Sequence, residues 1–163
     1  SAAIAALAVS GQHTARFAFE GFLSVNRNQR TAHLEQLRQE QRTMIFYEAP
    51  HKLCRTLADM AAVFGGDRSL SLCRELTKIH EEVRLTTFAD AIAYYENTPP
   101  RGEFVLVVAG AVPQQEAQLT LEEAAERVRQ YVADGQKLTQ ACKTVAAETG
   151  HRKSDLYDAV QKD

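Results

Sequence analysis

The 163-residue chain is long enough for one domain with a sizeable core, and its hydrophobic share of 45% and charged share of 25% are ordinary for a soluble globular protein. Its net charge of −2 excludes a strong overall field for nucleic acid, so binding of that kind needs a local patch. Its three cysteines are widely spaced and form neither a metal motif nor a disulfide framework, and no apolar run is long enough to span a bilayer, which together predict a cytoplasmic protein without membrane segments.

The first forty residues predict a helix, a strand and a second helix. Residues 1–11 are rich in alanine and end at Gly11, a residue typical of the position after a helix. The alternating aromatic residues 16–23 predict a strand, and the polar residues 26–41 predict a helix. Ser1 stands where a helix cap follows a strand and a turn, and neither precedes it here. We therefore expect the chain to be a fragment of a longer protein.

The next strand-to-helix junction carries a carboxylate. Residues 43–47 predict a buried strand, and Pro50 suits the first turn of a helix that extends to about Phe64. Glu48 therefore lies at the end of a strand, where its side chain can accept hydrogen bonds from ligand hydroxyls or cap the following helix. The residues alone leave both roles open.

Residues 69–78 are the most informative stretch of the chain. Residues 70–73 are short and apolar, which predicts a buried strand. Four polar residues follow within five positions: Arg74, Glu75, Thr77 and Lys78. An open α/β sheet places its chemistry at the carboxyl ends of its strands, so this cluster is a candidate substrate site. A strand end whose charges are only solvated is the alternative that these residues leave open.

Further strands and helices alternate up to residue 111. Residues 82–87 and 103–110 predict two more strands, the second apolar enough to be buried on both faces. Residues 89–97 predict the helix between them. This alternation predicts an α/β fold over residues 1–111, in which a sheet is layered with helices. We expect that sheet to be mixed.

The rest of the chain predicts a separate helical part. Residues 112–118, in which Pro, Gln and Glu replace the apolar pattern, predict a linker. Residues 119–163 then predict a small bundle of three helices, over 121–134, 137–149 and 153–162. The last two have the rhythm of a helix-turn-helix, whose second helix would contact nucleic acid through Arg152 and Lys153. A helical bundle with no ligand is supported almost equally.

Five short motifs follow one another along nearly the whole chain: Ser1-Ala2, Glu20-Gly-Phe-Leu23, Ile45-Phe-Tyr-Glu-Ala-Pro-His51, Arg74-Glu-Leu-Thr-Lys78 and Gly102-Glu103. In this order and spacing they resemble the carboxyl-terminal part of the ribosomal RNA small subunit methyltransferase I family, within the tetrapyrrole methylase superfamily. The first is the tail of that family's Gly-Pro-Ser-Ala motif. The chain departs from the family at Lys52, where Arg is usual, and at residues 24–26, which replace a Pro followed by basic residues.

The resemblance implies both a fold and an activity. The fold would be the second lobe of a tetrapyrrole-methylase-like enzyme, and the glycine-rich amino-terminal lobe would be missing. The activity would be transfer of a methyl group from S-adenosylmethionine to the ribose 2′-hydroxyl of a cytidine in 16S rRNA of the 30S particle, by an enzyme that is typically a homodimer. The single lobe is expected to fold without being active.

The resemblance also implies roles for individual residues. The wall of the cofactor site would consist of Ser1, Ala2, Tyr47, Glu48, Leu76 and Thr77. Arg74, Glu75 and Lys78 would orient the substrate, with Glu75 or Lys78 as the proton acceptor, and no metal is expected. RNA would be contacted by His51, Lys52, Arg152 and Lys153. Two alternatives stay open: a tetrapyrrole methyltransferase, and a non-catalytic RNA-binding or dimerisation module.

Overall fold

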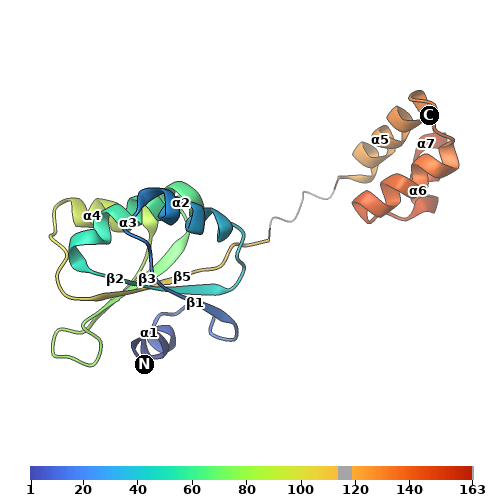
Figure 1. Ribbon diagram of the computed structural model, residues 1–163. Helices are drawn as coiled ribbons and strands as arrows, with labels where there is room; N and C mark the ends of the chain where they lie inside the picture. Colours follow the sequence, from blue (N-terminus) through green and yellow to red (C-terminus); the bar gives the residue numbers. More distant parts are fainter. Residues whose placement is uncertain (114–118, 163) are drawn as a thin grey trace. The chain divides into compact units, whose positions relative to one another are not determined.

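The computed structural model describes residues 1–113 and 119–162 (Figure 1). The chain divides into two compact units, residues 1–113 and residues 114–163, which are described separately below. Most of the predicted linker, residues 114–118, lies outside the described residues. Within the described residues, no helix is both long and apolar enough to cross a membrane.

The first unit is built on a five-stranded sheet. Its strands are β1 (Phe17–Phe22), β2 (Thr43–Glu48), β3 (Ser69–Arg74), β4 (Glu82–Thr87) and β5 (Phe104–Val108). They lie in the order β1-β2-β5-β3-β4. The β1–β2 pair is parallel and the other three pairs are antiparallel, so the prediction of a mixed sheet is confirmed.

Helices cover both faces of this sheet (Figure 1). Helix α1 (Ala2–Val9) lies on one face, and α2 (Arg27–Gln36), α3 (Pro50–Phe64) and α4 (Phe88–Glu96) lie on the other. Local sequence sets their starts: Pro50 occupies the first turn of α3, and the Asn26 and Thr87 side chains accept the capping hydrogen bonds of α2 and α4. The predicted helix over residues 26–41 is shorter than expected, since α2 stops at Gln36.

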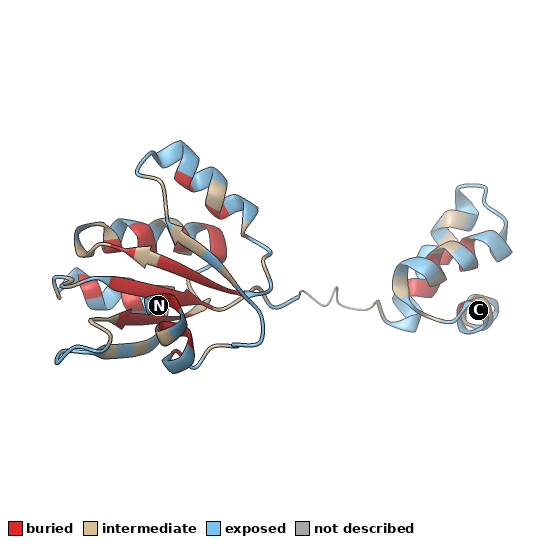
Figure 2. Ribbon diagram, turned by 60° about the horizontal axis from the view of Figure 1, so that its bottom comes forward, coloured by how far each residue is buried: buried red, intermediate tan, exposed pale blue. Residues whose placement is uncertain are grey.

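Alternation along the strands separates two hydrophobic cores. The larger core lies under α3 and α4 and includes Met44, Phe46, Leu57, Leu72 and Leu106. The smaller core lies under α1 and includes Leu7, Ile45, Cys73, Val105 and Val107. Figure 2 shows the buried residues along the sheet and on the helix surfaces that face it. We call the two sides of the sheet the α3 side and the α1 side.

The second unit is a bundle of three helices: α5 (Leu121–Ala133), α6 (Leu138–Thr149) and α7 (Lys153–Gln161). They enclose a small core that includes Val128, Cys142 and Leu156. A capping box between Thr120 and Glu123 starts α5, and Gly150, in the left-handed conformation, ends α6. The predicted α/β fold and the predicted helical bundle are therefore both confirmed.

Candidate functional site

The turn that follows β3 has an unusual backbone. Glu75 and Thr77 both adopt positive φ angles, of 51° and 64°. The amide of Lys78 donates to the carbonyl of Glu75 at 3.0 Å, and the amide of Thr77 donates to the carboxylate of Glu81 at 2.6 Å. Left-handed backbone is uncommon for residues other than glycine, and it often marks a functional site. These two hydrogen bonds hold the turn in that conformation.

The Glu75 carboxylate is the centre of this turn. It pairs with the Lys78 ammonium at 2.9 Å and accepts a hydrogen bond from the Glu103 amide at 3.2 Å. Gly102 leaves room for it, because a Cβ at that position would overlap the carboxylate. The hydrogen bond from Lys78, reinforced by that from the Glu103 amide, lowers the pKa of Glu75, and the same pairing raises the pKa of Lys78. At neutral pH the pair is therefore a carboxylate and an ammonium.

A shallow pocket of about 100 Å³ lies beside this pair on the α1 side of the sheet. Its lining residues come from α1, β3, the turn and β5: Ala2, Cys73, Glu75, Leu76, Lys78, Glu103 and Val105. We call it the α1-side pocket. Four of the predicted site residues, Ala2, Glu75, Leu76 and Lys78, thus come together in one place. The pocket offers an apolar wall with an acid–ammonium pair beside it.

Two other predicted wall residues lie close to this pocket in the structure. Tyr47 packs, together with Leu76, against the smaller core under α1. Its ring also makes edge-to-face contacts with Phe19 and Phe22, with centroids 5.2 and 5.6 Å away. Ser1 is the cap residue of α1, next to Ala2. Tyr47 therefore extends the apolar wall of the α1 side toward β1.

Glu48 lies on the other face of the sheet from Tyr47. It is buried, accepts a hydrogen bond from the Thr56 hydroxyl at 2.6 Å, and accepts another from the Ala49 amide at 2.9 Å. Both donors belong to the first half of α3 or to the residue that precedes it. In this structure the carboxylate fastens α3 to β2 through these two hydrogen bonds.

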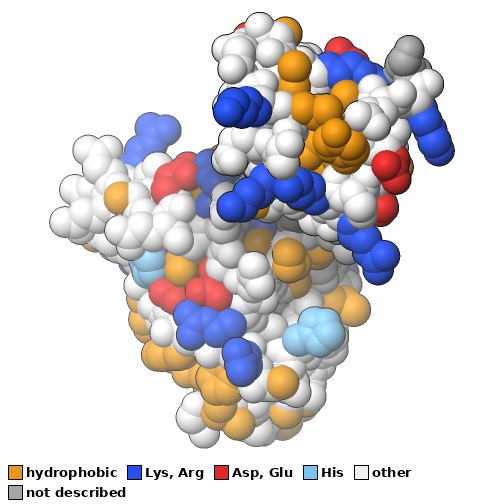
Figure 3. Space-filling model, turned by 90° about the vertical axis from the view of Figure 1, so that its right-hand side faces the viewer, with side chains coloured by type: hydrophobic (Ala, Val, Ile, Leu, Met, Phe, Trp, Pro, Cys, Tyr) orange, Lys and Arg blue, Asp and Glu red, His pale blue; other side chains and the backbone are white. Residues whose placement is uncertain are grey.

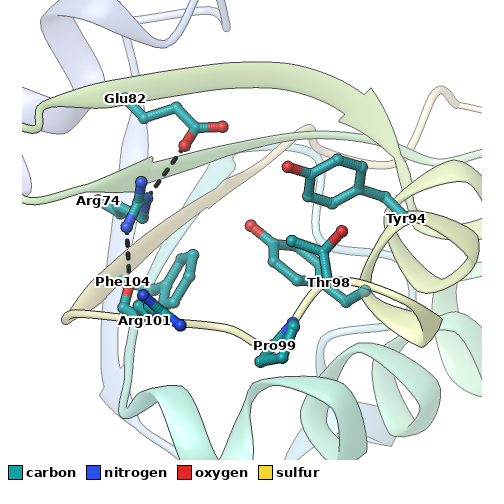
Figure 4. A pocket seen from close by; sticks show the side chains of 8 residues that line it. Arg74, Glu82, Tyr94, Thr98, Pro99, Arg101 and Phe104 are labelled. Carbon is teal, nitrogen blue, oxygen red and sulfur yellow. Dashed lines mark hydrogen bonds and ion pairs between the residues drawn. The ribbon is translucent and has the colours of Figure 1, made fainter.

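Arg74 is also separated from its predicted partners. Its side chain lies on the α3 side of the sheet, pairs with Glu82 at 3.0 Å and donates to the Arg101 carbonyl at 3.3 Å (Figure 4). It lines a second pocket of about 280 Å³, which we call the α4-side pocket. Arg74 is the last residue of β3 and Glu75 begins the left-handed turn, and the two side chains line different pockets.

The predicted RNA-binding residues lie in two places. His51 and Lys52 are in the first turn of α3, with His51 exposed. Arg152 caps α7 and Lys153 begins it, and both side chains are exposed. Figure 3 shows hydrophobic side chains gathered on the presented face of the helical bundle, with Lys and Arg side chains around them. On that face the bundle presents apolar and cationic side chains, with acidic ones beside them (Figure 3).

Several lining residues escaped the sequence reasoning. Cys73 and Val105 line the α1-side pocket, and Tyr94, Tyr95 and Arg101 line the α4-side pocket. Side chains alternate between the two faces along β3 and β5, and this alternation would have identified Cys73 and Val105. The second group depends on the pairing of β3 with both β4 and β5, which lies beyond local sequence. Within the described residues, no cluster of His, Cys, Asp or Glu is suited to a metal ion.

Comparisons with known proteins support the resemblance. The chain is 45% identical over 96% of its length to the ribosomal RNA small subunit methyltransferase I of Synechocystis, and 40% and 38% identical over 98% of its length to the proteins of that name from Mycobacterium tuberculosis and Bacillus subtilis. It spans about half of those relatives, 55–56% of their lengths. No family model matches the chain.

Among solved structures, the cobalt precorrin-4 methyltransferase CbiF matches 65% of the chain and 46% of its own length, with 16% identity and a TM-score of 0.46. That likeness is too low to carry an argument about the site. The similarity to the curated relatives covers nearly all of the chain at 37–45% identity. The resemblance that the five motifs indicate is thus confirmed: the chain is homologous to proteins named ribosomal RNA small subunit methyltransferase I.

Proposed function

We propose that this chain, a homologue of small subunit rRNA methyltransferases, supplies one wall of a site that transfers a methyl group from S-adenosylmethionine to a ribose 2′-hydroxyl of a cytidine in 16S rRNA. The observation that carries the proposal is the α1-side pocket. Residues far apart in sequence come together there, and five of the lining residues belong to the five motifs: Ala2, Glu75, Leu76, Lys78 and Glu103. The names of the relatives supply the reaction class.

The α1-side pocket fits part of S-adenosylmethionine. Its apolar wall of Ala2, Leu76 and Val105 suits an uncharged portion of the cofactor, and the Glu75–Lys78 pair beside it is left for the substrate. Ser1, Tyr47 and Thr77 extend this wall, while Glu48 acts indirectly by holding α3 to β2. When bound, the cofactor supplies a methyl group activated by a sulfonium. A volume of about 100 Å³ holds only a fraction of such a molecule, so further wall is needed.

Of the two candidate proton acceptors, Glu75 is the one that is unprotonated at neutral pH. Its lowered pKa keeps it ionised at neutral pH, whereas the raised pKa of Lys78 keeps that side chain protonated. Lys78 then orients the carboxylate and offers a donor to the substrate. Arg74, on the opposite face of the sheet, positions the substrate from outside the reacting centre.

The RNA-binding and assembly proposals rest on the homology. His51 and Lys52 at the start of α3, together with Arg152 and Lys153 on the helical bundle, would contact phosphates of the 30S rRNA. Neutralising Arg152 and Lys153 together should lower the salt dependence of RNA binding by about 0.7 logarithmic units for each lost phosphate contact on single-stranded RNA. We further propose a cytoplasmic homodimer, as the resemblance implies.

One experiment tests the proposed function directly. A chimera in which this sequence replaces the matched region of the Synechocystis relative is assayed for methyl transfer to 30S particles, beside the 163-residue chain. We expect the chimera to be active, and Glu75→Gln to slow it about 100-fold, the usual contribution of one acid–base group. Glu96→Gln, an exposed carboxylate on α4, is the matched control and should leave the rate unchanged.

Measurements of cofactor binding distinguish a partial cofactor site from a complete one and from an RNA-binding module. Calorimetric titration should show S-adenosylmethionine binding the 163-residue chain more than about tenfold more weakly than the chimera, a difference above about 1.4 kcal/mol. Equal affinity would mean that these residues hold the whole cofactor site. An inactive chimera that binds 30S rRNA but no cofactor would identify an RNA-binding module instead and overturn the proposal.

A further inference from the structure

The α4-side pocket is a second candidate site, on the opposite face of the sheet from the α1-side pocket. Its volume of about 280 Å³ is the larger of the two, and it lies between the end of β3, the start of β5 and helix α4 (Figure 4). Its walls combine three aromatic rings with charged and polar groups: Arg74, Glu82, Tyr94, Tyr95, Thr98, Pro99, Arg101 and Phe104. Of these lining residues, Arg74 alone has a role in the proposed methyl transfer.

A buried tyrosine in this pocket has no hydrogen-bond partner within the described residues. Tyr95 is only 8% exposed, and its ring packs at right angles on Phe104 and Tyr94, with centroids 6.0 and 4.9 Å away. Burial raises the pKa of its hydroxyl, which therefore stays protonated and can donate as well as accept. Among the described residues, this hydroxyl is not one of the buried polar atoms that lack a partner, so it is open to the pocket. A ligand bound there can therefore form a hydrogen bond with it.

The second tyrosine presents a rigid aromatic surface at the rim. The Arg84 guanidinium lies over the Tyr94 ring, 3.9 Å from its centroid, and itself pairs with Glu82 at 2.9 Å. The Arg84 Nε is buried without a hydrogen-bond partner, so the stacking on Tyr94 is the main interaction that holds this part of the group. The contact with Arg84 thus holds the Tyr94 ring in place, while more than a third of the residue remains exposed.

The charges around the pocket favour an anion. Glu82 is shared by Arg74 and Arg84, so it neutralises one of the two. Arg101 adds another cation at the rim, exposed and without an acidic partner among the residues that the structure describes. The local balance of three arginines to one glutamate is therefore positive, in a chain whose net charge is −2. An exposed, uncommitted arginine beside aromatic rings is the arrangement that binds a phosphate next to a base.

We propose that the α4-side pocket binds one nucleotide of an RNA strand, with the base against Tyr94 and the Tyr95 hydroxyl and the phosphate at Arg101. The proposal rests on the proposed function, because that function supplies the RNA. The nucleotide bound here is not the reacting one, because the two pockets lie on opposite faces of the sheet. The pocket then sets the register of the strand relative to the reacting hydroxyl.

Binding to the 163-residue chain tests this directly. The probes are a single-stranded cytidine-containing decaribonucleotide, cytidine 5′-monophosphate and inorganic phosphate. The binding of each probe is measured from the changes in the amide chemical shifts of the chain in NMR spectra. We expect the decaribonucleotide to shift the amides of residues 94–104. Tyr95→Phe should weaken binding about fivefold, the effect of one hydrogen bond. Arg101→Gln should weaken it about tenfold and lower the salt slope by about 0.7, the effect of one phosphate contact.

Matched variants separate the pocket from general charge and folding effects. Arg55→Gln removes an exposed arginine of α3 outside the pocket, and Tyr157→Phe removes a hydroxyl of the helical bundle, so both should leave binding to these amides unchanged. Tyr95→Phe and Arg101→Gln should keep the melting temperature of the native chain. A loss of binding that follows a loss of folding in both variants would overturn the assignment.

The probes also distinguish the sources of the ligand. Equal affinity for inorganic phosphate would reduce the pocket to an anion site, and tighter binding of the mononucleotide than of the decaribonucleotide would make its ligand a free nucleotide. Either result, or RNA-induced shifts elsewhere only, overturns the proposal. Each would leave methyl transfer by the chimera untouched, so the two proposals fail separately. In the active chimera, Arg101→Gln should raise the KM for 30S particles and leave kcat unchanged.

Discussion

The two faces of the sheet differ in how completely helices cover their apolar side chains. On the α3 side, three helices close a continuous core in which large side chains such as Leu57 and Phe46 are fully or almost fully buried. On the α1 side, one helix of eight residues covers only the middle of the sheet. Phe19 and Phe22 of β1 remain 55% and 67% exposed there, and Leu85 of β4 remains 62% exposed.

The two faces therefore contribute differently to the stability of the fold and to ligand binding. The α3 side carries most of the apolar burial and therefore most of the free energy of folding. The α1 side keeps apolar surface and an ionic pair accessible, as a ligand-binding surface requires. The charged end of β3 contributes to both sides, because Arg74 belongs to one and Glu75 to the other.

The largest expected effect comes from matched truncations on the two faces. Leu57→Ala, at a fully buried site on the α3 side, should lower the free energy of unfolding by about 2–5 kcal/mol. Leu85→Ala removes the same atoms from the exposed α1 side and should change it by no more than about 0.5 kcal/mol. Urea denaturation measures both. Similar losses in the two variants would contradict the division between the faces.

The reactivity of the Cys73 thiol tests how well α1 covers the sheet at the α1-side pocket. Burial, with a smaller contribution from Glu81, raises the pKa of Cys73 to about 11, so only about 0.1% of it is thiolate at pH 8. Exposed Cys54 should therefore be alkylated by iodoacetamide at least about 100-fold faster than Cys73, as mass spectrometry of peptides would show. Cys73 labelling should accelerate about tenfold per pH unit up to pH 10. Rapid labelling at pH 8 would mean that α1 does not cover this part of the sheet.

Glycine substitutions test the support of the Glu75 carboxylate. Gly102→Ala forces a Cβ into that carboxylate at a position with a φ of 76°, whereas Gly150→Ala, at a left-handed position with the same φ, meets nothing within 4 Å. Gly150→Ala should therefore cost about 1–2 kcal/mol from the backbone alone. Gly102→Ala should cost more and should also weaken cofactor binding by the chimera. Equal melting temperatures and equal affinities in the two variants would remove Gly102 from the site.

The smallest effect is the pH dependence of the Glu75–Lys78 pair. The folded-state pKa of Glu75 lies below its unfolded value, so the pair stabilises the fold above about pH 4.3 and loses that contribution as the pH falls through the folded pKa. Glu75→Gln should flatten the stability profile over this acidic range and leave it unchanged from pH 6 to pH 8. A variant whose profile differs at neutral pH instead would show that another group titrates.

Local sequence predicted the elements well, because their signals lie within them. Pro50 and Gly65 bracket α3, and the predicted range of that helix agrees with the structure. The mixed character of the sheet follows from pairings between distant strands, which no local pattern contains. The five motifs located the turn around Glu75 but grouped Arg74 with it, although the two side chains line different pockets. The left-handed backbone that begins at Glu75 has no signal in the sequence. The pocket around Tyr95 needed the full tertiary structure.

The left-handed backbone at Glu75 and Thr77 has a consequence for protein engineering. A β-branched residue at a φ of 64° is a genuine outlier, and glycine at position 77 would relieve about 1–2 kcal/mol of strain. A screen for heat-resistant variants would therefore favour Thr77→Gly. A screen for methyl transfer should reject it, because a glycine there loosens the turn that holds the Glu75 carboxylate. Selection for thermal stability and selection for activity therefore favour different residues at position 77.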